Sequence, residues 1–122
     1  MIVFTTEERD GATVVRLFGH LGAEDAPAEL ADRLDQVGLG GPLLVDLTEA
    51  TPVPGPAVAE LLARLEAGRR RSATVLVHGD LEARRSLRAI SRQLPVVPDV
   101  AQAVAGHFSA TLAPRRPGTP VG

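Results

Sequence analysis

Three residues near the ends of predicted strands have side chains capable of acid–base or metal chemistry: His20, His78 and Asp80. In α/β proteins, functional sites form at the carboxyl ends of strands. No second carboxylate, nucleophile elbow or histidine pair at metal-binding spacing accompanies them. The chain also has no cysteine, which excludes disulfides, thiolate metal sites and cysteine nucleophiles. We therefore predict no catalytic residue, no metal and no cofactor, and we interpret Asp80 as a helix N-cap.

Hydroxyl groups that could accept a phosphate are scarce around the proline-rich segment 51–56. Thr48 and Thr51 are the only candidates there. We expect Thr48 to bond to the backbone near a strand end and Pro52 to constrain Thr51, so we favour neither as a phosphorylation site. The alternating prolines could form a polyproline ligand. We favour a rigid connection between a strand and a helix.

The basic residues are all arginine, and they are concentrated in the second half of the chain. Residues 1–66 hold 12 acids and 4 arginines, whereas residues 67–122 hold 3 acids and 9 arginines. Such asymmetry can mark a nucleic-acid surface. The sequence has only three aromatic residues, all phenylalanine, so we predict no base-stacking platform and no nucleic-acid partner. Four arginines at helical spacing could form a basic stripe, but we favour a solvated helix face: Arg84, Arg85, Arg88 and Arg92.

The hydrophobic pattern predicts nine elements in the order ββαβαβαβα, with a hairpin turn at Asp10-Gly11. The expected strands cover Ile2 to Thr6, Thr13 to Phe18, Leu43 to Val45, Thr74 to Val77 and Leu94 to Val97. The expected helices run from the cap Asp25 to Gly38, from Ala57 to Leu65, from the cap Asp80 to Ile90, and from Val100 to Phe108. We therefore predict an α/β domain with a mostly parallel sheet of four to five strands and about four helices.

The length and polarity of the chain limit the number of domains and the membrane segments it can form. A sequence of 122 residues fits one domain, which we place at residues 1–108. The segment from Ser109 onward has little to bury, so we expect residues 109–122 to be a disordered tail. The amino terminus lacks the features of a signal peptide, and no apolar run approaches the length of a membrane span. We expect a cytoplasmic protein without membrane insertion.

Residues 13–108 resemble the STAS family, the sulfate transporter and anti-sigma-factor antagonist domains. The segment Val14 to Leu21, followed by Ala28-Glu29-Leu30 and Leu34, is similar to the opening strand, Gly-x-Leu corner and helix of that family. The segment Leu43 to Thr48 resembles its strand ending in Asp-Leu-Ser or Asp-Leu-Thr. The resemblance implies a STAS-like fold. It also implies a bacterial protein that interacts with other proteins in signalling and transcription regulation, and that is not an enzyme.

The resemblance also implies a switch position. Antagonists of the family carry Asp-Ser-Ser-Gly or Asp-Ser-Thr-Gly in the loop after that strand, and counting from Asp46 puts Pro54-Gly55-Pro56-Ala57 there. Gly55 takes the place of the phosphorylated serine and cannot accept a phosphate. Pro56 and Gly55 still suit the first position and the N-cap of a helix.

By resemblance, the partner would be an anti-sigma factor of the histidine-kinase-like ATPase type, bound without control by serine phosphorylation. The expected contact residues lie in the loop and at the start of the following helix: Thr51, Val53, Pro54, Gly55, Pro56 and Val58. Two alternatives remain open. One is a scaffold in a signalling complex or a small subunit of a lipid-transport ATPase, and the other is a domain that binds a nucleotide or a lipid. The sequence does not decide the oligomeric state.

Overall fold

The computed structural model describes residues 2–22, 27–37, 42–53, 55–68, 73–91 and 93–105. Several sequence-based predictions lie outside the described residues: the caps Asp25 and Gly38, the contact residue Pro54, Arg92, the helix end at Phe108, and the tail 109–122.

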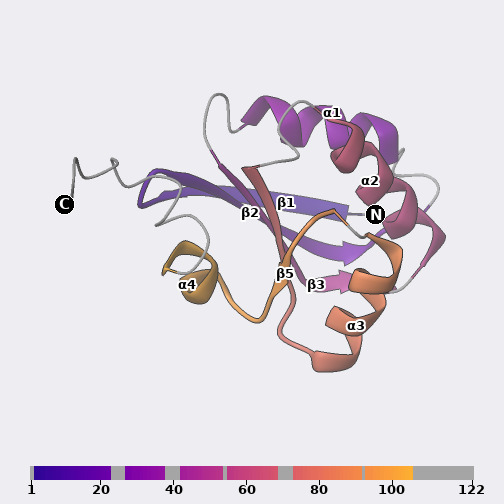
Figure 1. Ribbon diagram of the computed structural model, residues 1–122. Helices are drawn as coiled ribbons and strands as arrows, with labels where there is room; N and C mark the ends of the chain where they lie inside the picture. The colour runs from indigo at the N-terminus through magenta and orange to yellow at the C-terminus, as the bar shows by residue number, and fades with distance from the viewer. Residues whose placement is uncertain are drawn as a thin grey trace.

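The order of elements is the one predicted from the hydrophobic pattern, ββαβαβαβα (Figure 1). The strands are β1 (Ile2–Arg9), β2 (Ala12–His20), β3 (Leu43–Thr51), β4 (Thr74–Val77) and β5 (Val96–Val97). The helices are α1 (Pro27–Val37), α2 (Pro56–Ala67), α3 (Leu81–Ile90) and α4 (Val100–Ala103). The last strand is shorter than expected, because its ladder with β4 begins after Pro95, which has no N–H to donate.

The five strands form one sheet in the order β1-β2-β3-β4-β5. The hairpin of β1 and β2 is antiparallel, and every other neighbouring pair is parallel. Asp10 and Gly11 connect the hairpin with φ angles of 52° and 85°. Two consecutive positive φ angles match the turn that suits the twist of paired strands, which explains the Asp-Gly dipeptide.

Helices cover the two faces of the sheet unequally. Side chains that alternate along a strand point to opposite faces, so Val45 and Leu44 on β3 mark the two sides. Val45 belongs to the larger buried cluster, which includes residues of α1, α2 and α3: Leu30, Leu34, Leu61, Leu62, Leu65 and Leu87. Leu44 belongs to a smaller cluster with Val100 and Ala103 of α4. Three helices therefore pack on one face, and the short α4 packs on the other.

Candidate functional site

The predicted contact loop lies at the edge of the sheet where the parallel strands β2 and β3 both end. The backbone N–H of Leu21, just after β2, donates to the carbonyl oxygen of Thr51 at 2.7 Å. This bond ties the end of β2 to the last residue of β3. The chain then crosses to α2, which begins at Pro56. The loop is thus held by the sheet at one end and by a helix at the other.

Gly55 is the N-cap of α2, with proline in the first turn, which confirms the predicted helix start. Its φ of −168° and ψ of 160° are extended and open to any residue. Space is the reason for glycine. A Cβ at this position would lie 2.7 Å from Cγ of Pro52 and 3.1 Å from its carbonyl oxygen. The position to which the sequence resemblance assigns a serine is therefore partly filled by the Pro52 ring.

The residues predicted to contact a partner differ in exposure. Thr51 and Pro56 are exposed, while Val53 and Gly55 are half-buried. Val58 is fully buried in the core and presents no side-chain surface to a partner. We expected Val58 to contact a partner, and the structure places its side chain in the core instead. The signal was available, because Val58 shares the i, i+3, i+4, i+7 stripe of α2 with Leu61, Leu62 and Leu65.

A pocket of about 290 Å³ opens beside the loop. It is lined by the end of β2, the first residue of α1, Pro52 and the first turns of α2: His20, Leu21, Gly22, Pro27, Pro52, Pro56, Ala57 and Glu60. Of the predicted contact residues that the structure describes, only Pro56 lines it. Sequence reasoning missed the pocket because its walls come from four segments that the fold brings together.

Two of the three candidate acid–base residues, His78 and Asp80, form hydrogen bonds at the start of α3. The side chain of Asp80 accepts from the N–H of Ala83 at 2.9 Å, which confirms it as the N-cap of α3. The N–H of Asp80 donates to Nδ1 of His78 at 3.0 Å. Burial lowers the pKa of His78, against the opposing effect of the Asp80 carboxylate. His20 lies apart from this pair, at the end of β2. Within the described parts of the chain, no group of three or more His, Cys, Asp or Glu side chains could hold a metal ion.

The hydroxyl of Thr48 bonds to a backbone group, as the sequence predicted, but that group belongs to a distant segment, and its local bond is to a side chain. Its hydroxyl donates to Oδ1 of Asp46 at 2.6 Å and accepts from the N–H of Gly79 at 3.1 Å. The hydroxyl therefore links the end of β3 to the residue pair after β4. Thr51 is the exposed threonine of the contact loop, and its backbone carbonyl accepts the bond from Leu21.

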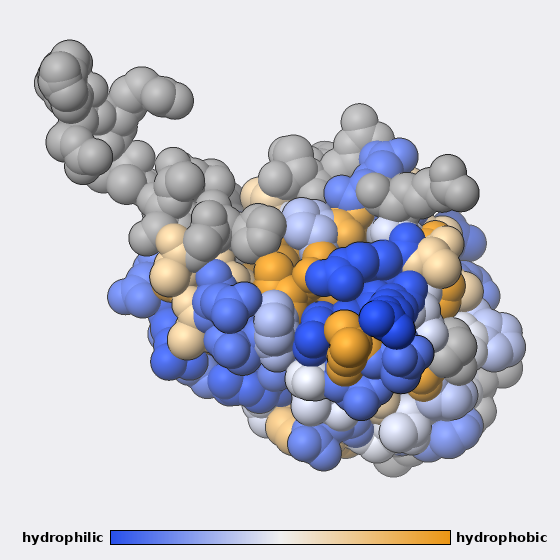
Figure 2. All heavy atoms as spheres, turned by 60° about the horizontal axis from the view of Figure 1, so that its bottom comes forward, coloured by the Kyte–Doolittle hydropathy of each residue, from blue (hydrophilic) through white to orange (hydrophobic). Residues whose placement is uncertain are grey.

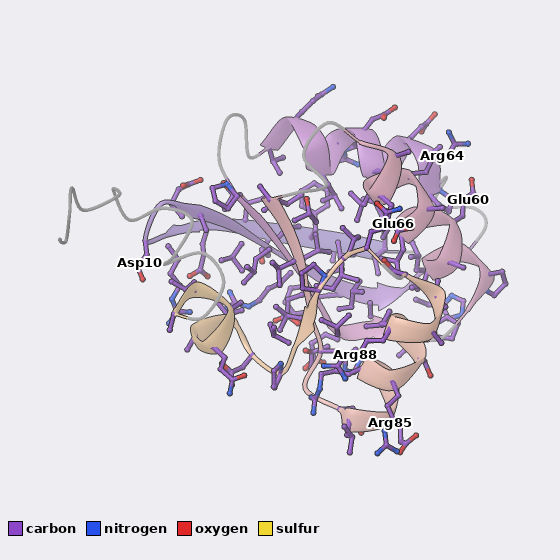
Figure 3. The ribbon with its side chains drawn as sticks, in the orientation of Figure 1. Asp10, Glu60, Arg64, Glu66, Arg85 and Arg88 are labelled. Atoms are coloured by element: carbon purple, nitrogen blue, oxygen red, sulfur yellow. The ribbon has the colours of Figure 1, made fainter. Side chains whose placement is uncertain are left out.

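The arginines of α3 are not a uniform solvated face. Arg84 donates to the carbonyl oxygen of His78 at 2.9 Å, and Arg88 donates to that of Val96 at 2.8 Å. Only Arg85 makes the exposed pair expected of a surface helix, with Glu82 at 2.9 Å. Figure 3 labels Arg85 and Arg88 on this helix. Arg84 and Arg88 therefore connect α3 to β5 and to the residue after β4 by hydrogen bonds.

Figure 2 brings the side of α3 and α4 forward and shows hydrophilic residues over most of it, with hydrophobic ones in smaller groups.

Comparisons with known proteins identify the fold. Neither the protein-family models nor the curated proteins give a match to the sequence. Among solved structures, an anti-sigma factor antagonist from Mycobacterium paratuberculosis matches with 24% identity and a TM-score of 0.66, over 86% of this chain and 92% of that one. The anti-sigma factor antagonist SpoIIAA in its unphosphorylated form matches with 19% identity and a TM-score of 0.50, over 90% of this chain and 100% of that one. The chain is a STAS-like domain in fold, as the sequence predicted.

The helices are all too short or too polar to cross a membrane, within the part of the chain that the structure describes.

Proposed function

We propose that this chain is a non-catalytic interaction module of the anti-sigma-factor antagonist kind, acting in the cytoplasm. Its partner would be an anti-sigma factor of the histidine-kinase-like ATPase type. The observation that carries the proposal is the loop between β3 and α2. It forms a helix start at Gly55 and Pro56, and this is the position to which the family resemblance assigns the switch. The fold shared with two anti-sigma factor antagonists supports it.

The contact surface proposed here is formed by the loop itself. Thr51 and Pro56 offer exposed side chains, and Val53 and Gly55 are half-buried beside them. Pro54 completes the loop in sequence. Val58 would act from behind the surface, by fixing α2 against the core, where it is fully buried. Proline fixes φ, so the loop loses little conformational entropy when a partner docks.

Control by serine phosphorylation is absent from this proposal. A phosphoserine would add about −1.5 to −2 charges at the helix N-terminus. Gly55 has no hydroxyl, and the Pro52 ring stands 2.7 Å from where its Cβ would be. The module would therefore be competent to bind at all times, or would be controlled by other means.

The test is affinity capture from the native lysate followed by reconstitution of the purified pair. We expect the wild type to capture a histidine-kinase-like ATPase, and Thr51→Arg to lose it, because Thr51 is exposed in the contact loop. Thr6→Arg is the matched control, since Thr6 is an equally exposed threonine on the distant strand β1. Both variants must first show the far-ultraviolet circular dichroism of the wild type.

Two results would overturn the proposal. Stable transfer of phosphate from the captured ATPase to residues 50–60 would contradict the absence of phosphorylation control. Capture of a transporter ATPase or a larger signalling complex in place of an anti-sigma factor would favour a scaffold or subunit role.

A further inference from the structure

The pocket beside the contact loop is lined in part by residues whose backbone is restricted. Three of its lining residues are prolines, Pro27, Pro52 and Pro56, whose rings restrict the backbone. Leu21, another lining residue, is only 1% exposed, and Ala57 is packed against the larger core cluster. Restricted and packed groups lose little entropy when a ligand binds. Its shape is therefore suited to receiving a group from outside.

The size of the pocket limits what can enter. A cavity of about 150 Å³ lined by apolar side chains can hold one benzene molecule, and pockets for drug-sized ligands begin at about 300 Å³. At about 290 Å³, this pocket has room for one large apolar side chain, and it is small for a nucleotide or a lipid chain. Among the described lining residues, His20 is the one side chain that could donate to a phosphate.

The rim of the pocket carries a carboxylate that is free to meet a cation. Glu60 is exposed and forms no ion pair with any described residue. Figure 3 shows Glu60 and Arg64 on the outer side of α2, and no ion pair joins them although they are one turn apart. Glu60 is the acidic side chain among the described residues that line the pocket. The rim of the pocket is therefore complementary to a cation.

We propose that the pocket receives a large apolar side chain of the partner protein, and that an arginine or lysine beside this side chain pairs with Glu60. The partner's identity rests on the proposed function, whereas the chemistry rests on the pocket. The apolar side chain would supply most of the affinity, because buried anchors dominate interfaces. The cation would select the partner, since charges at a rim act mainly on specificity and association rate.

The experiment uses a displayed library of short random peptides as the probe, selected on the full chain. We expect enriched peptides to carry a large apolar residue close to an arginine or lysine. Binding of a synthesised winner should weaken by about tenfold or more in Glu60→Arg, which opposes the cation, and in Ala57→Leu, which fills the pocket. Asp32→Arg is the matched charge control on α1, and Ala67→Leu is the matched volume control at the far end of α2. Both residues are exposed, and both variants should bind as the wild type does.

Enrichment of acidic peptides, or winners that bind Glu60→Arg as tightly as the wild type, would overturn the proposal. A selection without enrichment would also overturn it. Because Ala57 is half-buried, the Ala57→Leu result is used only if the free energy of unfolding of that variant equals that of the wild type. If it does not, Glu60→Arg decides the test, since Glu60 is exposed.

The two proposals fail in different ways. A captured anti-sigma factor whose binding depends on Thr51 but ignores Glu60→Arg and Ala57→Leu would refute the pocket and leave the proposed function standing. Peptides whose binding needs Glu60, together with failure to capture an anti-sigma factor, would refute the proposed function and leave the pocket standing.

Discussion

Replacing Gly55 by serine, the residue that the family resemblance places there, should destabilise this protein. In an unstrained site the change would help, because it lowers the entropy of the unfolded chain by about 0.4–1 kcal/mol and improves the N-cap by a few tenths. Here the new Cβ lies 2.7 Å from Cγ of Pro52 and 3.1 Å from its carbonyl oxygen. A change of ring pucker can move Cγ, but it leaves the backbone oxygen in place. Overpacking typically costs about 1–3 kcal/mol, so we expect Gly55→Ser to lower the free energy of unfolding by about 1 kcal/mol.

The same chain offers a control for the added Cβ. The φ of Gly79 lies outside the left-handed region. Among the described residues, a Cβ there would approach only Cγ2 of Thr48, at an ordinary 3.6 Å. Gly79→Ala should therefore be neutral or stabilising by up to about 1 kcal/mol. The assay is urea unfolding followed by circular dichroism, since the sequence has no tryptophan or tyrosine for fluorescence. A Gly55→Ser variant at least as stable as the wild type, with Gly79→Ala behaving as expected, would refute the argument from Pro52.

Three further changes test the structural roles assigned around the site, each by urea unfolding. Asp80→Ala removes the bond to the N–H of Ala83 and should lower the free energy of unfolding by about 0.5–2 kcal/mol. Asp80→Asn keeps a capping oxygen and should retain most of the wild-type stability. An Asp80→Ala variant as stable as the wild type would contradict the role of Asp80 as a cap. Glu66→Ala removes acceptors of bonds from Ser91 Oγ at 2.6 Å and from a backbone N–H at 3.0 Å, and should cost about 1–3 kcal/mol, with Glu66→Gln milder. Burial lowers the pKa of His78, so the unfolded chain takes up the proton first as the pH falls. As the pH falls below about 6.5, the free energy of unfolding should then decrease by at most about 1.4 kcal/mol per pH unit. His78→Asn should make this decrease shallower. Equal slopes in the wild type and in His78→Asn would contradict the prediction.

The order of elements could be predicted because each one has a local cause. Short apolar runs gave the buried parallel strands, and the strand Thr74–Val77 matches its predicted bounds. The hairpin was predicted too short, because Glu7 and Glu8 are charged and do not look like strand residues. They lie on the edge strand β1, where charge is tolerated, and Glu8 accepts a bond from the hydroxyl of Thr13 at 2.8 Å. That stabilisation comes from the partner strand and has no signal within the segment itself.

The candidate site could be predicted only in part, for the same physical reason. The helix start at Gly55 and Pro56 follows from residue type and position alone. The close approach of Pro52 to Gly55 requires the folded path of the loop, which residue types do not specify. The bonds of Arg84 and Arg88 to backbone carbonyls are also non-local, because they join α3 to the ends of β4 and β5. A helical spacing of arginines identifies neighbours on the helix, but it does not reveal what lies opposite them.

The loop between β3 and α2 combines a helix start with a glycine at the position to which the family resemblance assigns a phosphorylated serine. A charge switch at a helix N-terminus needs a hydroxyl and room for the phosphate. Gly55 has no hydroxyl, and the Pro52 ring lies 2.7 Å from where its Cβ would be, so a serine at this position would be crowded. The same ring, with Pro56, lines the pocket that we propose as the anchor site. On the proposed function, control of binding would then act at the pocket, where any molecule that fills it competes directly with the partner's apolar side chain.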